Sequence, residues 1–311
     1  MEIVYFISAS HPYKKVIYSG VGPPFARAFG WKVETVKGLA EEACDVGIID
    51  NRLEADDLPI LESFFDRPQH QRFPVFFRLS DTDQPRSQSG GIRFILGKAN
   101  FQGVHFILTY EPKGPMLQFT KTLTTSRIAR LPYPYERRRE VDRDMATRRR
   151  RVFMSGANSA NLYPLRVSLR RRRTWNPVLW WAVSDLKHPG YPEFCGKSAH
   201  EIVRDRYVNH ASGHSHFFLC PTVYEVELSR YVECAYAGCV PIGQAPTSLR
   251  PWIDQYLIPS VGKVAELVQA LMKDEIELNE RAAGYRSLMR TLRDPAKLAA
   301  NLEDQIRNCV T

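Results

Sequence analysis

Two glutamates separated by seven residues mark the part of the sequence best suited to chemistry. Glu225 and Glu233 lie within HFFLCPTVYEVELSRYVECAYAGCVPIG, residues 216–243. An apolar run ends at Cys220, and a second one follows Gly238. The pattern predicts a strand, a loop, a helix and a strand, with the first glutamate at a strand's carboxyl end, where parallel α/β sheets bind ligands. Since ionised carboxylates accept hydrogen bonds from vicinal hydroxyls, the segment predicts a site for a ribose or hexose.

A second segment has the composition of a phosphate-binding turn. The residues SGANS, at positions 155–159, lie between a predicted strand and a predicted helix. Around Gly156 and Asn158, backbone N–H groups could approach a phosphate, and the helix dipole would favour the anion. Arg166, in the first turns of the helix, could add a fixed positive charge. An ordinary tight turn explains the segment about as well, because it has no GxGxxG or P-loop pattern.

The segment that carries the two glutamates resembles the nucleotide-sugar-binding motif of GT-B glycosyltransferases. In that motif a glutamate, seven residues, a second glutamate and a small-residue turn precede the next strand. The sequence CPTVYEVELSRYVECAYAGCVPI is similar to that of exostosin-like enzymes in particular. The resemblance implies an α/β fold of two Rossmann-like domains facing across a cleft, the C-terminal one for the donor and the N-terminal one for the acceptor.

The same resemblance implies a reaction. It is the transfer of a hexose or pentose from a UDP- or GDP-linked donor to an acceptor hydroxyl, with no metal and no other cofactor. The expected acceptor is a glycan, a lipid-linked sugar or a modified nucleic acid. Retaining GT-B enzymes usually have Gly-Phe-Gly after the first glutamate, whereas this sequence has Val226, Glu227 and Leu228, so inversion and retention both stay open.

Transferred residue by residue, the resemblance places Glu233 on the ribose hydroxyls of the donor and Glu225 near the sugar or its diphosphate. Arg230 would neutralise phosphate charge as the nucleoside diphosphate leaves. His188 ends a strand-like segment and could contact a donor phosphate or simply occupy a turn. The expected donor site comprises Gly156, Asn158, Arg166, His188, Tyr224, Glu225, Ser229, Arg230 and Glu233.

An inverting enzyme also needs a general base that deprotonates the acceptor hydroxyl. Candidates at the ends of predicted strands in the first half are His11, Asp50, Asp81 and Glu111, and the sequence does not choose among them. The triplet 81–83 is also a D-x-D pattern, which can hold a divalent metal with a donor diphosphate. Because the other donor features lie in the second half, we predict no metal site.

Apolar periodicity indicates how the chain is organised. It predicts an N-terminal α/β domain (1–135), a basic linker (136–150), a C-terminal Rossmann-like domain (151–280) and C-terminal helices (281–311) that could pack back on the first domain. Expected strands are Ile3 to Ile7, Val33 to Val36, Val46 to Ile49, Val75 to Phe77, Val104 to Leu108, Val152 to Met154 and Val178 to Val183. The tail from Gly262 should be helical, with interruptions at Gly284 and Pro295.

The net charge of +9 is concentrated in arginine runs at 137–139, 148–151 and 170–173. They could bind an acidic surface such as nucleic acid, a membrane or a phosphorylated substrate, or form a solvated linker and helix face. The alternative functions are therefore a nucleic-acid-binding protein with a Rossmann-like core, or a glycosyltransferase that acts on modified DNA. Trp175, Trp180 and Trp181 could join the last run in a basic aromatic surface, although the expected strand would bury at least one of them.

The remaining features favour a soluble cytoplasmic protein, or one peripheral to a membrane. The sequence has no run of about eighteen apolar residues, and its first residues lack the basic lead of a signal peptide. The six cysteines are scattered and are expected to be reduced thiols. His210, His214 and His216 have a spacing that could hold a metal, but we expect a solvated turn.

Overall fold

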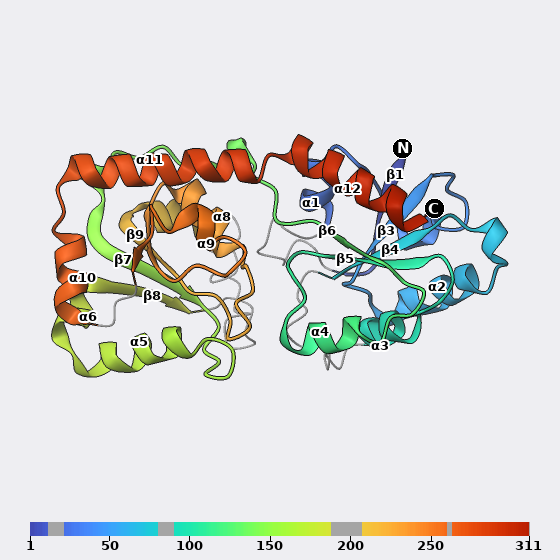
Figure 1. Ribbon diagram of the computed structural model, residues 1–311, viewed down its shortest axis with the longest axis horizontal. Coiled ribbons are helices and arrows are strands. Elements are labelled where there is room, and N and C mark those ends of the chain that lie inside the picture. Colours follow the sequence, from blue (N-terminus) through green and yellow to red (C-terminus); the bar gives the residue numbers. More distant parts are fainter. Residues whose placement is uncertain (12–21, 80–89, 188–206, 260–262, 311) are drawn as a thin grey trace. The chain divides into compact units, whose positions relative to one another are not determined.

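The computed structural model describes residues 1–11, 22–79, 90–187, 207–259 and 263–310, and it contains two compact units (Figure 1). Unit 1 consists of Met1–Pro134 and Pro295–Thr311, and unit 2 of Tyr135–Asp294. Each unit has its own parallel sheet, which confirms the predicted α/β class. Residues 136–150, expected to be a linker, are part of unit 2, where Met145 and Arg148 are buried.

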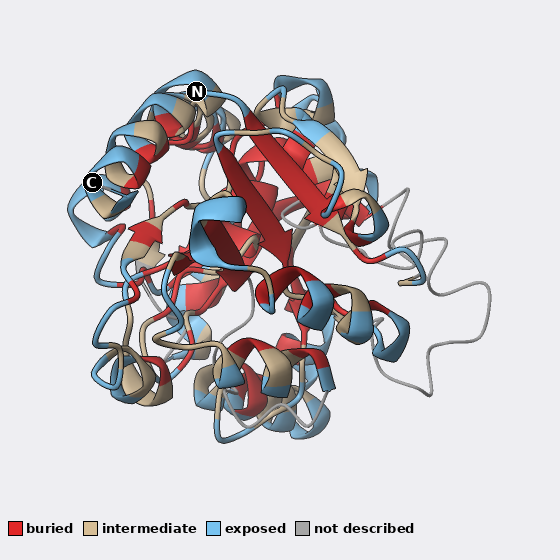
Figure 2. Cartoon of the chain, turned by 90° about the vertical axis from the view of Figure 1, so that its right-hand side faces the viewer, coloured by how far each residue is buried: buried red, intermediate tan, exposed pale blue. Residues whose placement is uncertain are grey.

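Unit 1 is built on a six-stranded sheet in the order β2-β1-β3-β4-β5-β6, with parallel neighbours throughout. Its central strands are buried between helices, as their continuous apolar runs predicted (Figure 2). The strands are β1 (Ile3–Ile7), β2 (Lys32–Thr35), β3 (Val46–Asp50), β4 (Val75–Leu79), β5 (Val104–Leu108) and β6 (Ile128–Arg130). The helices from this part of the chain are α1 (Gly22–Ala28), α2 (Leu58–Phe65), α3 (Gly90–Gly97) and α4 (Gly114–Thr120).

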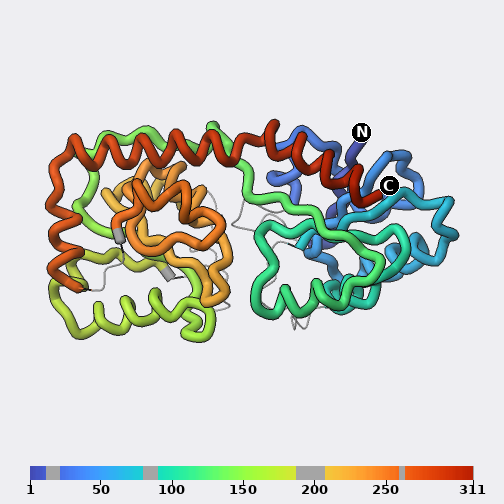
Figure 3. Tube along the Cα trace, viewed as in Figure 1, coloured from blue at the N-terminus to red at the C-terminus, as the bar shows by residue number. Residues whose placement is uncertain are grey.

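The last helix of the chain, α12 (Pro295–Val310), packs on the sheet of unit 1 (Figure 3). Leu298, Leu302 and Ile306 recur every fourth residue and form one buried face against the core. The Gln305 side chain accepts a hydrogen bond from the backbone N–H of Arg130 (2.7 Å) and donates one to its carbonyl (3.1 Å). The helix therefore satisfies backbone groups of the edge strand β6.

Unit 2 is built on a five-stranded parallel sheet in the order β11-β10-β9-β7-β8. Its strands are β7 (Arg149–Gly156), β8 (Val183–Lys187), β9 (His214–Leu219), β10 (Val240–Gly243) and β11 (Ile258–Pro259). Its helices include α5 (Pro164–Trp175), α6 (Pro177–Ala182), α8 (Arg230–Ala237), α9 (Arg250–Ile253), α10 (Val264–Leu271) and α11 (Glu275–Leu292). Because β7, β9 and β10 are adjacent and parallel, the loops after them meet at one edge of the sheet.

The strand predicted at Val178–Val183 is wrong. Residues Pro177–Ala182 form the helix α6, and β8 begins only at Val183. The Asn176 side chain caps α6 by accepting a backbone N–H at 3.1 Å, and the proline in the first turn loses no intrahelical hydrogen bond. Trp180 and Trp181 are consequently exposed on a helix, and neither is in the core.

The helical tail is confirmed in outline but is divided differently. The break between α10 and α11 occurs before Asp274, whose side chain caps α11, and Pro295 begins α12. Helix α11 continues through Gly284 without interruption. A Cβ at this glycine would lie 2.4 Å from the ring of Tyr256, so the residue is explained by close packing and not by a helix end.

The arginine runs are largely engaged in contacts within unit 2. The Arg148 guanidinium is buried and donates to the carbonyl of Ala237 at 2.9 Å. Arg170 makes a two-pronged ion pair with Asp185, with nitrogen–oxygen distances of 2.7 to 3.0 Å. Arg173 donates to the carbonyl of Val183 at 2.8 Å. These contacts give the runs a structural use, and the nucleic-acid-binding alternative gains no support from them.

Candidate functional site

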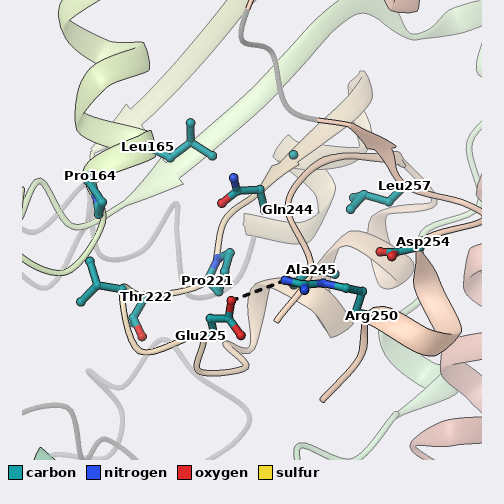
Figure 4. A pocket seen from close by; sticks show the side chains of 12 residues that line it. Pro164, Leu165, Pro221, Thr222, Glu225, Gln244, Ala245, Arg250, Asp254 and Leu257 are labelled. Carbon is teal, nitrogen blue, oxygen red and sulfur yellow. Dashed lines mark hydrogen bonds and ion pairs between the residues drawn. The ribbon is translucent and has the colours of Figure 1, made fainter. Parts of the chain in front are cut away.

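Unit 2 contains a pocket of about 630 Å³ at the carboxyl edge of its sheet (Figure 4). The loops that follow β9 and β10 and the first turn of α5 surround it. Its lining residues are Pro164, Leu165, Pro221, Thr222, Val223, Glu225, Gly243, Gln244, Ala245, Arg250, Asp254 and Leu257. Ligands of parallel α/β sheets bind at this edge, so the pocket is the candidate binding site.

Glu225 lies at this pocket, as the sequence predicted from its place after a strand. Its backbone has a φ of +53°, a conformation that is uncommon for a side chain larger than glycine. Thr222 stabilises the turn, because its carbonyl accepts the Glu225 N–H at 2.8 Å and its hydroxyl accepts the N–H groups of Tyr224 and Val226, both at 3.3 Å. The carboxylate lies 3.5 Å from the Arg250 guanidinium (Figure 4).

Glu233 lies away from the pocket lining, in a connected group of buried polar side chains. Helix α8 begins at Arg230, and Arg230 donates to Glu233 at 2.5 Å. The same guanidinium lies over the ring of Tyr207, 4.5 Å from its centroid. The Tyr207 hydroxyl is 2.5 Å from the Ser155 hydroxyl at the end of β7. Burial raises the pKa of Tyr207, so the phenol stays neutral beside the guanidinium.

Arg166 holds a buried positive charge beside this group. Its guanidinium stacks 4.2 Å from the Tyr163 ring centroid and donates to the Ala157 carbonyl at 3.3 Å. Among the described residues no carboxylate forms an ion pair with it. Gly156 has a φ of +112°, and a Cβ there would lie 2.7 Å from a guanidinium nitrogen of Arg166. Position 156 therefore needs glycine for two reasons: the positive φ, and the space that the Arg166 guanidinium occupies.

Glu227, for which the sequence suggested no role, has a structural one. Its carboxylate accepts hydrogen bonds from Arg293 at 2.6 and 3.2 Å, and both side chains are buried. Arg293 follows the end of α11, so the pair joins that helix to the loop before α8. Glu227 therefore stabilises unit 2 and does not line the pocket.

In unit 1, two of the candidate bases differ sharply in environment. His11 Nδ1 lies 2.8 Å from the Glu54 carboxylate, which orients the imidazole, and Nε2 of the same ring is buried. Asp50 is fully buried and accepts hydrogen bonds from the Tyr5 hydroxyl (2.6 Å) and the Gly22 N–H (2.9 Å). His11 thus has a carboxylate partner at one ring nitrogen, whereas the Asp50 carboxylate accepts hydrogen bonds from neighbouring groups of unit 1.

The other predicted residues divide into three groups. Glu111 forms an ion pair with Arg130 within unit 1. Asn158 is exposed in the loop after β7, and Ser229 directly precedes α8 without a side-chain capping bond. Asp81 and His188 lie outside the described residues, together with the rest of the D-x-D triplet and the HPGY segment.

Sequence reasoning missed several residues at this edge. Thr222, Gln244 and Arg250 line the pocket, and Tyr207 connects the buried polar group. Gly243, directly after an apolar run, was the feature of the sequence that could have indicated this edge. In the structure its φ is +132°, and a Cβ there would lie 2.0 Å from a carbonyl oxygen of β9. Such a glycine after an apolar run marks a tight approach of two backbones.

The expected histidine turn is wrong for all three members. His214 and His216 lie on β9 and are buried, whereas His210 is exposed on a helical segment, residues 207–212, that precedes it. Burial lowers the pKa of His214 to about 4 and that of His216 to about 3. Within the described ranges, no three His, Cys, Asp or Glu side chains are grouped as ligands of one metal ion.

Solved structures share this fold over most of their length. A structure of Anabaena HepE in complex with UDP-glucose has a TM-score of 0.59 and 11% sequence identity, and the match covers 99% of this chain and 100% of that one. WaaG, a glycosyltransferase involved in lipopolysaccharide biosynthesis, has a TM-score of 0.51 and 10% identity over 96% of this chain and 99% of its own. These proteins are GT-B glycosyltransferases.

This chain has the GT-B fold. The trehalose-6-phosphate synthase OtsA is a further match, with a TM-score of 0.50 and 10% identity over 88% of this chain and 74% of that protein. No family model matches the sequence. The resemblance to exostosin-like enzymes in particular stays a prediction. Within the described ranges, no helix combines the length and apolar composition needed to cross a bilayer.

Proposed function

We propose that the chain is a glycosyltransferase that moves a hexose or pentose from a nucleotide-sugar donor to an acceptor hydroxyl, with the donor bound by unit 2. The observation that carries this proposal is the pocket at the carboxyl edge of the second sheet in a chain with the GT-B fold. The HepE structure contains UDP-glucose, which favours a UDP-linked over a GDP-linked donor.

The charges at this edge suit a diphosphate. The buried guanidinium group of Arg230 lies over the Tyr207 ring, and the positive charges of Arg230 and Arg166 both oppose the rise in the pKa of Tyr207 that burial causes. The amino terminus of α5, a twelve-residue helix, opens at the pocket with Pro164 and Leu165. Fixed cations and helix N-terminal N–H groups stabilise charge that develops on a leaving phosphate. We propose that they do so here without a metal.

The two glutamates take different parts in this proposal. Glu225, with its carboxylate at the pocket beside Arg250, would accept hydrogen bonds from donor hydroxyls. Glu233 has one oxygen engaged by Arg230. It would orient that guanidinium towards phosphate, and its other oxygen could still accept a hydroxyl of the ribose. The ribose contact implied by the motif is therefore kept for Glu233 as a proposal.

The acceptor side is proposed for unit 1. A glycan or a lipid-linked sugar presents hydroxyls whose attack on the donor an inverting enzyme assists with a base. Of the candidates that the structure describes, His11 is a histidine whose ring is oriented by a carboxylate, because Glu54 lies 2.8 Å from Nδ1. We therefore propose His11 as that base for an inverting reaction.

Titration calorimetry with UDP tests the donor site. Wild-type protein should bind UDP, and Gly156→Ala should weaken the binding about ten- to hundredfold, because the new Cβ displaces the Arg166 guanidinium that contributes charge-assisted hydrogen bonds. Gly97→Ala is the matched control, since a Cβ there has no neighbour within 4 Å. Hydrolysis of UDP-glucose should persist in EDTA if no metal takes part.

Two results would contradict this proposal. Wild-type protein that binds none of UDP, GDP, ADP, TDP and CMP would argue against a nucleotide-sugar site altogether. UDP binding that is equally tight in wild type and in folded Gly156→Ala would remove Arg166 from the site. Circular dichroism of each variant separates a loss of binding from a loss of folding.

A further inference from the structure

An exposed group of apolar side chains lies at the junction of α5 and α6. Trp175, the last residue of α5, is 89% exposed, and Trp180 and Trp181 on α6 are 63% and 52% exposed. Val178 beside them is 42% exposed. We call these four residues the indole patch. Large apolar side chains gathered at a surface mark sites of interaction, whereas single ones need no explanation.

The local structure fixes this exposure. Helix α6 buries Leu179 and Ala182 against unit 2, so its remaining positions face outward. The Asn176 side chain caps the helix and sets its direction after α5. The indole patch therefore lies at exposed positions of α5 and α6, two consecutive helices (Figure 1) that pack against each other.

The surroundings of the patch are strongly basic. Of the arginines next to the patch, Arg171 is exposed and Arg151 and Arg173 are half-buried, while Arg170 is paired with Asp185. Arg151 and Arg173 donate to main-chain carbonyls around the end of α6, which are neutral, so both groups keep their charge there. The Arg173 guanidinium lies 6.0 Å from the Trp180 ring centroid, and Arg171 is exposed on the preceding turn.

We propose that the indole patch docks unit 2 on a membrane surface that contains anionic lipids. Tryptophan prefers the boundary between headgroups and acyl chains, because its ring is apolar and its N–H can still bond to water or headgroups. Each arginine near an anionic leaflet adds about a fivefold factor in affinity. The patch and its arginines together supply both contributions that interfacial binding requires.

A single-stranded nucleic acid fits the same surface less well. Such strands follow a basic groove in which successive bases stack on aromatic rings. The indole patch lies on the outside of two helices, and it includes Val178, which has no ring for stacking. An aliphatic side chain does contribute to insertion between lipid headgroups. The membrane is thus the occupant that uses all four residues.

The proposed docking surface is separate from the donor pocket. Helix α5 begins at the pocket with Pro164 and ends at Trp175, so the patch lies towards the amino ends of the strands. Strand β7 connects the two edges with eight residues, which corresponds to about 26 Å. Docking would therefore leave the pocket open to a donor from water, and membrane binding should not need UDP.

Co-sedimentation with lipid vesicles tests the proposal. Wild-type protein should sediment with phosphatidylcholine vesicles that contain phosphatidylglycerol, and less with phosphatidylcholine alone or in high salt. The triple variant Trp175→Ser, Trp180→Ser and Trp181→Ser should lower vesicle affinity at least tenfold while UDP binding is unchanged. Trp252→Ser is the matched control, because Trp252 is also 52% exposed in unit 2 but lies on α9.

A second variant keeps the test decisive if the triple variant folds poorly. Arg171→Glu retains every tryptophan and should lower affinity for anionic vesicles about five- to twentyfold. Wild-type protein that does not sediment with anionic vesicles would overturn the proposal. Folded triple and Arg171→Glu variants that sediment to the same extent as wild type would overturn it as well. Binding of a twenty-nucleotide single strand that depends on the tryptophans, without vesicle binding, would assign the patch to nucleic acid instead.

Discussion

Glu225 and Glu227 are two positions apart, yet the structure gives them opposite environments. Glu225 is at the pocket, with a side chain that is 42% exposed and an ion pair of 3.5 Å to Arg250. Glu227 is buried against Arg293 with two hydrogen bonds. An exposed ion pair contributes about 0 to 1 kcal/mol to stability, whereas removing one partner of a buried pair leaves an uncompensated charge.

Replacing each glutamate by glutamine separates these roles. We expect Glu227→Gln to lower the free energy of unfolding by about 3 to 5 kcal/mol, because Arg293 loses its counter-charge inside unit 2. Glu225→Gln should change stability by less than about 1 kcal/mol but reduce turnover of a nucleotide-sugar donor. Urea unfolding and donor hydrolysis measure the two effects. An equally unstable Glu225→Gln would contradict this assignment.

The sequence identified residues of the site better than it identified their contacts. Glu225 could be placed at a strand end because an apolar run stops just before it. Tyr207 and Thr222 could not be found in this way, since their roles depend on hydrogen bonds to Ser155 and to the backbone of a turn. The exposed or buried state of a carboxylate also depends on tertiary partners such as Arg293, which is distant in the sequence.

At the scale of elements, strands of the core were predictable and one helix was not. The runs that became β1, β3, β4 and β5 are short, largely apolar, rich in β-branched and aromatic residues and bounded by turns, which favours a buried strand. The run at Val178–Val183 is as apolar, but the cap at Asn176 and the following proline favour a helix. Periodicity alone does not separate these two cases in so short a segment.

Helix α11 offers a prediction about packing. Glycine in a helix interior is normally less favourable than alanine by about 1 kcal/mol. A Cβ at Gly284 would lie 2.4 Å from Tyr256, so we expect Gly284→Ala to destabilise the protein by about 1 to 3 kcal/mol. In a Tyr256→Ala background the same change should stabilise the helix. Urea unfolding of wild type, the two single variants and the double variant completes a double-mutant cycle. Changes in unfolding free energy that simply add would contradict the packing explanation.

At the scale of the whole molecule, long-range contacts decide which segments belong together. Helices α11 and α12 are adjacent in the sequence, but α11 packs in unit 2 and α12 in unit 1. The buried face of α12 predicts that it packs on a core, yet it does not say on which one. The hydrogen bonds between the Gln305 side chain and the backbone of Arg130 in β6, 175 positions apart, join α12 to unit 1.

The stability of unit 2 should depend on pH through two buried histidines. Burial lowers the pKa of His214 to about 4 and that of His216 to about 3, against about 6.5 in the unfolded chain. Among the described residues, Nε2 of each ring is buried without a hydrogen-bond partner, so a proton there would lack an acceptor. Below pH 6.5 the unfolded chain therefore binds protons that the folded chain excludes, and stability falls as pH falls.

The size of this effect distinguishes it from general acid sensitivity. Each histidine should cost about 2 kcal/mol of unfolding free energy between pH 7 and pH 5, with no loss above pH 7. The variant His216→Gln should remove about half of this pH dependence whatever it does to stability at pH 7, while the exposed His70→Gln should leave it unchanged. Urea unfolding at the two pH values gives the comparison. If wild type and His216→Gln lose the same unfolding free energy between pH 7 and pH 5, folded His216 does not have the lowered pKa that its burial implies.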